Sequence, residues 1–150
     1  IFWANSNSIA GNATASVFNS IVQGGYSGTN ILNTNPLFSN PPSNLSLGNC
    51  SQAIDYGIDS LNSLSLDIVG NTRKFDAISG GSQIDIGAYE YQSSLENFYI
   101  GPINDNLWSN NQNWSKGFKP NSCDHVIIPN NKILIVNESG IIRSLSNGSN

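Results

Sequence analysis

The sequence predicts an all-β fold in which short strands stack as a solenoid, and three observations support this prediction. Apolar residues recur in short clusters separated by Asn, Ser and Gly, which favour tight turns. Charged residues make up only 11% of the chain, which argues against long helices with a charged outer face. Two of the clusters begin 20 residues apart, at Ile1 and Ile21, a period typical of stacked coils.

Composition and charge exclude two classes of partner. The net charge of −4 and the pI near 4.6 leave no basic face to neutralise phosphates, so we expect no nucleic-acid binding. No apolar run approaches the roughly 18 residues of a membrane span. The chain contains no Met and opens on an apolar cluster, so we expect it to be an internal piece of a longer protein.

The first coils are expected within residues 1–26. Short clusters at 1–5, 8–12, 16–20 and 21–25 each combine apolar residues with turn formers. The side chains expected to form the stacked interior are Ile9, Val17, Phe18, Ile21 and Val22. After Tyr26 the chain contains three prolines before position 43 and few strand signals, so we expect it to leave the regular coils there.

A cap is expected to follow the coils. Residues 45–57 and 64–73 each begin with an apolar–polar–apolar triplet, and residues 84–91 alternate as a final strand. Such a segment would cover the open edge of the last coil. The strand would direct Ile84, Ile86 and Ala88 toward the core and Asp85, Gly87, Tyr89 and Tyr91 toward the other face.

Four motifs in this region occur in an order that resembles a known family. They are Asn35-Pro36-Leu37-Phe38, then Leu45-x-Leu47 with Ser51-Gln52-Ala53-Ile54-Asp55-x-Gly57, then Asp67-x-x-Gly70-Asn71-x-Arg73, and Asp85-Ile86-Gly87-Ala88-Tyr89-Glu90. The order is similar to the C-terminal end of a right-handed parallel β-helix in large secreted and surface-anchored bacterial proteins. The chain departs from the family at Gln52, where Pro is usual, and at Cys50, where a small residue is usual. The resemblance implies that residues 1–92 form a last coil and its cap.

A second module is expected after this cap. Residues 93–97 are predicted to be a linker, and residues 98–150 are predicted to begin a β module, solenoid or sandwich, that is truncated at the end of the sequence. Strands are expected at 126–128, 133–136 and 141–145. The segment is similar to the opening of a repeat-rich module in the same surface proteins, through Asn113-Trp114-Ser115, Pro120 and Asp124-x-Val126-x-Ile128-Pro129.

The acidic residues allow either structural or chemical roles. Acid–base catalysis on a glycan needs two carboxylates about 5–10 Å apart in a cleft, and a calcium loop needs alternate ligands around a glycine. Sequence spacing cannot show such a pair, and these acids do not alternate around a glycine, so turn and cap roles are favoured, with Ca²⁺ as the one cofactor considered. The residues weighed are Asp55, Asp59, Asp67, Asp76, Asp85 and Glu90. Salt bridges to nearby acids are favoured over a lyase role for Arg73 and Lys74.

The aromatic, histidine and cysteine residues also receive structural predictions. Burial is favoured over sugar stacking for Trp3, Trp108 and Trp114, and His125 has no Ser or Cys motif nearby that indicates a triad. Cys123 and His125 fall short of a four-ligand zinc site. A disulfide between Cys50 and Cys123 is considered, but two unpaired buried thiols are favoured. Sequons at Asn12, Asn44, Asn113 and Asn137 are no more than this composition gives by chance.

The resemblance implies a structural or adhesive role. The chain would stack and cap an extended stalk of a secreted or cell-surface bacterial protein, with surface glycans or host cell-surface ligands as partners. The alternative is the tail of a β-helical polysaccharide lyase or glycoside hydrolase whose active site lies upstream. We therefore expect no catalytic, cofactor-binding or metal-binding residues in this piece of the chain.

Overall fold

A computed structural model describes residues 1–4, 9, 15–78 and 83–148. The chain divides into two compact units, Ile1–Ser94 and Leu95–Asn150, called here the N-terminal unit and the C-terminal unit. The division falls within the segment 93–97 that the sequence predicts as a linker. Residues 96–98 of that region form a strand, and Leu95 and Asn97 are buried, so they belong to the body of the C-terminal unit.

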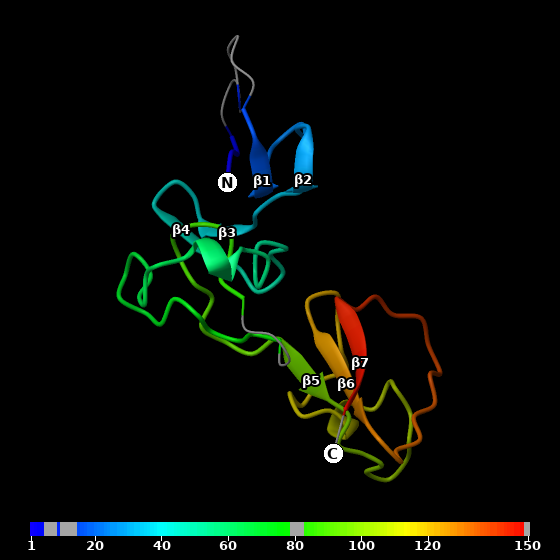
Figure 1. Ribbon diagram of the computed structural model, residues 1–150. Helices are drawn as coiled ribbons and strands as arrows, with labels where there is room; N and C mark the ends of the chain where they lie inside the picture. Colours follow the sequence, from blue (N-terminus) through cyan, green and yellow to red (C-terminus); the bar gives the residue numbers. More distant parts are fainter. Residues whose placement is uncertain (5–8, 10–14, 79–82, 149–150) are drawn as a thin grey trace. The chain divides into compact units, whose positions relative to one another are not determined.

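The described residues of the N-terminal unit form two separate two-stranded sheets (Figure 1). Strands β1 (Val17–Ile21) and β2 (Gly28–Leu32) pair in parallel. A Cβ on Gly28 would lie 2.1 Å from the carbonyl oxygen of Val17, so only glycine fits where the two strands begin. Strands β3 (Phe38–Asn40) and β4 (Asn44–Leu47) form an antiparallel hairpin.

The predicted fold class, the last coils and cap of a parallel β-helix, is wrong. The described residues form sheets of two, two and three strands, without a continuous stacked sheet. The parallel ladder of β1 and β2 is not continued by β3, because the chain turns at Pro41 and Pro42 and pairs β3 with β4 antiparallel. Proline lacks the N–H that a further ladder would require.

Several element predictions in this unit also change. Strand β2 lies after Tyr26, in the stretch where the sequence shows few strand signals and predicts that the chain leaves the regular coils. Phe18 was expected inside but is 55% exposed, whereas Ile21 and Val22 are buried as predicted. Of the expected cluster 8–12, only Ile9 lies within the described residues, and Asn12 lies outside them.

The segment 84–91 is not a strand. Ile84 and Ile86 are buried as predicted, but Asp85 and Glu90 are buried too, and Ala88 is exposed. The predicted two-faced alternation is therefore wrong. The other described residues of the unit include the short 3₁₀ helix η1 (Asp59–Leu61).

The C-terminal unit contains a three-stranded parallel sheet with the order β5-β6-β7 (Figure 1). The strands are β5 (Glu96–Phe98), β6 (His125–Pro129) and β7 (Ser144–Gly148), and a 3₁₀ helix, η2 (Asn111–Asn113), precedes β6. The strand predicted at 126–128 is confirmed within β6. The predicted strand 133–136 contributes only the bridge of Ile135 to Leu107, and the one predicted at 141–145 begins later, at Ser144.

An aromatic cluster forms the core of the C-terminal unit. Tyr99, Trp108, Trp114 and Val126 are buried together. The rings of Trp108 and Trp114 meet edge to face with centroids 4.8 Å apart, and Tyr99 meets Trp114 at 5.5 Å. The indole N–H of Trp114 donates to the carbonyl oxygen of Trp108 at 2.9 Å. The predicted burial of these two tryptophans is confirmed, and such contacts add to the energy of burial.

In the part of the chain that the structure describes, no helix is long and apolar enough to cross a membrane.

Candidate functional site

The charged residues of the N-terminal unit converge around the segment 84–91. Arg73 is only 8% exposed. Its Nη1 donates to Glu90 Oε2 at 3.0 Å and to the Tyr89 carbonyl at 3.3 Å. Its Nη2 donates to the carbonyls of Gly87 at 2.7 Å and Asp85 at 3.2 Å. These contacts explain why the segment is not a strand, because its carbonyls bond a guanidinium instead of a neighbouring strand.

The carboxylates around Arg73 accept hydrogen bonds from backbone N–H groups. Asp85 accepts from the N–H groups of Asp55 at 2.9 Å and Tyr91 at 2.7 Å. Glu90 accepts from those of Asp85 at 3.1 Å and Phe75 at 3.3 Å. We call Arg73, Asp55, Asp85 and Glu90 the carboxylate cluster.

Asp67 closes the turn that leads to Arg73. Its Oδ1 accepts from the N–H groups of Val69 at 3.0 Å and Asn71 at 2.8 Å, and its Oδ2 accepts from that of Glu90 at 3.1 Å. Burial opposes the charged form, but the N–H groups of Glu90 and Asn71 outweigh it and lower the pKa of Asp67. This is the turn-capping role that the sequence predicted for the acidic residues.

The surroundings of Asp55 and Glu90 disfavour the ionised forms of their carboxyl groups. Burial, followed by repulsion from Asp85 and Asp76, raises the pKa of Asp55 to about 6. Its Oδ2 accepts from the Ile78 N–H at 3.1 Å, whereas Oδ1 is buried and has no hydrogen-bond partner among the described residues. Burial also raises the pKa of Glu90 to about 7, although backbone N–H groups and Arg73 oppose the shift.

The basic pair of the N-terminal unit is engaged in salt bridges, as the sequence predicted. Arg73 pairs with Glu90, and Lys74 pairs with Asp59 at a partly exposed position. Asp59 also accepts from the Ile84 N–H at 2.8 Å. The hydrogen bond from Lys74 is the main reason that the pKa of Asp59 is lowered.

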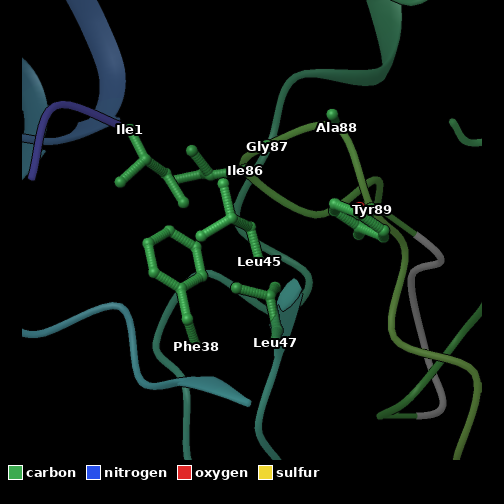
Figure 2. A pocket seen from close by; sticks show the side chains of 8 residues that line it. All are labelled: Ile1, Phe38, Leu45, Leu47, Ile86, Gly87, Ala88 and Tyr89. Atoms are coloured by element: carbon green, nitrogen blue, oxygen red, sulfur yellow. The ribbon is translucent and has the colours of Figure 1, made fainter. Parts of the chain in front are cut away.

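An apolar hollow of about 200 Å³ adjoins the segment that Arg73 holds. Figure 2 shows Ile1 and Ile86 facing Leu45, with the Phe38 ring to one side and Tyr89 to the other. Trp3 is not buried like the other two tryptophans; it lines a second hollow with Pro41 and Pro42. The first hollow is lined by Ile1, Phe38, Leu45, Leu47, Ile86, Gly87, Ala88 and Tyr89, and these side chains offer little polar chemistry.

In the C-terminal unit, His125 bridges two serines. Its Nδ1 lies 2.6 Å from Ser144 Oγ and its Nε2 lies 3.0 Å from Ser146 Oγ. Because both ring nitrogens bond hydroxyls, no carboxylate orients the ring as in a triad. Burial lowers the pKa of His125; Glu96 opposes this shift and Arg143 adds to it.

Sequence reasoning missed this His–Ser contact. The parallel register places His125 opposite Ser144, and 19 positions separate the two residues. The available signal was the spacing of Ser144 and Ser146, which puts both hydroxyls on one face of a strand.

The cysteine prediction requires a correction. Both Cys50 and Cys123 are disulfide-bonded, so the favoured pair of unpaired thiols is wrong. The two residues after Cys123 are engaged in other contacts. Asp124 accepts from Lys116 Nζ at 2.7 Å, and His125 bonds Ser144 and Ser146. Within the described residues, no group of three or more His, Cys, Asp and Glu side chains is placed to hold a metal ion.

No family model matches this chain, and no curated protein or solved structure is similar enough to it to count as a match.

Proposed function

We propose that this chain is a non-catalytic structural segment of a secreted or cell-surface protein. The observation that carries the proposal is the state of Arg73, the strongest candidate for a lyase residue. Its two terminal nitrogens have four N–H groups, and these make four bonds to Glu90 and to three carbonyls. The guanidinium therefore has no terminal N–H left for a substrate carboxylate.

The acidic residues support the same proposal. Acid–base catalysis requires a carboxyl group that reaches a substrate in a cleft. Asp67, Asp85 and Glu90 are at most 8% exposed and accept hydrogen bonds from several backbone N–H groups. These carboxylates thus hydrogen-bond the backbone of the N-terminal unit, and their burial keeps them from a substrate.

The cysteines support an extracellular location. Disulfides persist in oxidising compartments and are rare in the cytosol, and both cysteines of this chain are disulfide-bonded. Thiol titration in denaturant without a reductant should therefore detect no free thiol.

A hollow in the C-terminal unit that is lined by several amide and charged residues supports a binding role within this proposal. It has a volume of about 610 Å³ and is lined by Pro102, Asp105, Asn106, Asn130, Asn131, Lys132 and Ile133. Amide side chains can both donate to and accept from sugar hydroxyls. Surface glycans are therefore the partners that we propose for this segment.

An activity assay tests the structural role. We expect the purified chain to release no product from polygalacturonate or from neutral glycans, measured by absorbance of unsaturated uronates and by reducing ends. Turnover that Asp55→Asn abolishes, and that the matched surface variant Asp59→Asn retains, would contradict the proposal.

A further inference from the structure

The carboxylate cluster holds more negative than positive charge in a confined space. Asp85 and Glu90 belong to the segment 84–91, Asp55 is bonded to it through its N–H, and Arg73 is the cation that contacts it. The acids are linked in a chain, because the N–H of Asp55 donates to the Asp85 carboxylate and the N–H of Asp85 donates to that of Glu90. When all three acids are ionised, the three carboxylates and one guanidinium of the cluster carry a net negative charge.

Asp55 is the acid of the cluster whose carboxylate has a buried oxygen, Oδ1, without a hydrogen-bond donor within the described residues. Its electrostatic neighbours, Asp85 and Asp76, are both acidic. Desolvation and like charges both disfavour the ionised form of such a group.

The other charged groups near Asp55 are already paired with an opposite charge or bonded to backbone groups. Arg73 is bonded to Glu90 and to the carbonyls of the segment 84–91. Lys74 is paired with Asp59, and Asp67 accepts from the Glu90 N–H. Glu90, whose pKa burial raises to about 7, is paired with Arg73, so protonation of Asp55 is the way to remove the excess charge without breaking an ion pair.

We propose that the carboxylate cluster is a pH-dependent latch, which holds the segment 84–91 against residues 53–57 more firmly in mildly acidic than in neutral solution. Two backbone contacts join these segments in addition to the Asp55–Asp85 bond. The N–H of Gly57 donates to the Ile84 carbonyl at 2.7 Å, and that of Ile86 donates to the Ala53 carbonyl at 2.9 Å. Repulsion between Asp55 and Asp85 at neutral pH acts directly across this junction.

The direction of the effect follows from proton linkage. A carboxyl group whose pKa is higher in the folded state than in the unfolded state stabilises the fold below its unfolded pKa, and this stability is lost as the pH rises. The pKa of Asp55 rises from 3.8 to about 6 on folding, so the loss falls between about pH 4 and pH 6. Between pH 5 and pH 7.5 the full shift corresponds to about a tenfold rise in local opening. Because Asp55 is partly exposed, solvent screening makes tenfold the upper value.

Hydrogen-exchange mass spectrometry of the whole chain at pH 5 and pH 7.5 tests the proposal. After correction for intrinsic exchange rates, the opening constant of peptides covering 53–57 and 84–91 should rise several-fold from pH 5 to pH 7.5 in the wild type, up to about tenfold. Asp55→Asn keeps an acceptor for the Ile78 N–H and should reduce this rise, and the part that remains is the contribution of Glu90, whose pKa burial raises to about 7. The matched control, Asp59→Asn, should retain it, because Asp59 lies at a partly exposed pair with a lowered pKa.

Two outcomes would overturn the proposal. One is equal protection of these peptides at both pH values in the wild type, and the other is the same rise in Asp55→Asn as in the wild type. If Asp55→Asn does not fold, carbon-detected NMR titration of the wild type decides the matter. A midpoint for the Asp55 carboxyl near 6 supports the latch, and one below about 4.5 refutes it.

Discussion

The two units of this chain are stabilised in different ways. In the C-terminal unit, three parallel strands accompany a core of Tyr99, Trp108 and Trp114. The segment 84–91 of the N-terminal unit is instead fixed by a buried guanidinium that bonds backbone carbonyls and a carboxylate. Irregular backbone can therefore be held in one conformation without a sheet, provided that buried charges satisfy its polar groups.

This difference has an energetic consequence. An aromatic core loses stability roughly in proportion to the apolar volume removed, and it relaxes partly around the change. A charged network loses much more when a single member is removed, because the remaining charge and carbonyls stay buried without partners. The N-terminal unit should therefore be less tolerant of single substitutions and more tolerant of paired ones.

The largest effect is expected from Arg73→Leu. This change leaves Glu90 as an unpaired buried carboxylate and removes the donors of three carbonyls, so it should cost the N-terminal unit about 5 kcal/mol. Peptides covering residues 53–91 should lose hydrogen-exchange protection, while those of β5, β6 and β7 keep it.

A paired variant sharpens this prediction. Arg73→Leu combined with Glu90→Leu removes both charges, so it should recover part of the lost stability. A double variant that is less stable than Arg73→Leu alone would show that the buried charge is not the cause.

The next largest effect is expected in the C-terminal unit from Trp114→Ala. Trp114 is 1% exposed, and truncation of a buried Trp costs about 4 kcal/mol. Denaturant unfolding followed by Trp108 fluorescence should report the loss, and Trp114→Phe should lose less because a ring remains against Tyr99 and Trp108. Equal losses for Ala and Phe would indicate that the indole hydrogen bond, not the packing, dominates.

The sequence was sufficient to predict features that depend on local chemistry. The strand within 126–128 follows from Val126, Ile127 and Ile128, and the turn at Asp67 follows from an acid followed by Gly70 and Asn71. The burial of Trp108 and Trp114 follows from the general behaviour of tryptophan in small cores. Each of these features involves residues close together in the chain or a property of one side chain.

Features that depend on distant partners could not be predicted. The alternation in 84–91 is a valid strand pattern, but Arg73 bonds its carbonyls and draws Asp85 and Glu90 inward. The motif order likewise indicated stacked coils, whereas the hairpin of β3 and β4 ends the parallel ladder. The contact of His125 with Ser144 depends on strand register, which residue patterns alone do not fix.

The smallest effects are expected at two matched ion pairs on the surface, one in each unit. Lys74 pairs with Asp59 in the N-terminal unit, and Lys119 pairs with Glu138 at 2.5 Å in the C-terminal unit. Both lysine side chains are about half exposed, at 51% and 49%, and exposed pairs contribute about 0.5 kcal/mol or less. Lys74→Ala and Lys119→Ala should therefore cost the same small amount, measured by denaturant unfolding, and 0.5 M salt should abolish both losses. A much larger loss for Lys74→Ala that persists in salt would mean that the charged network of the N-terminal unit extends to its surface. The two units would then differ in how their surface charges contribute to stability, and not only in their buried groups.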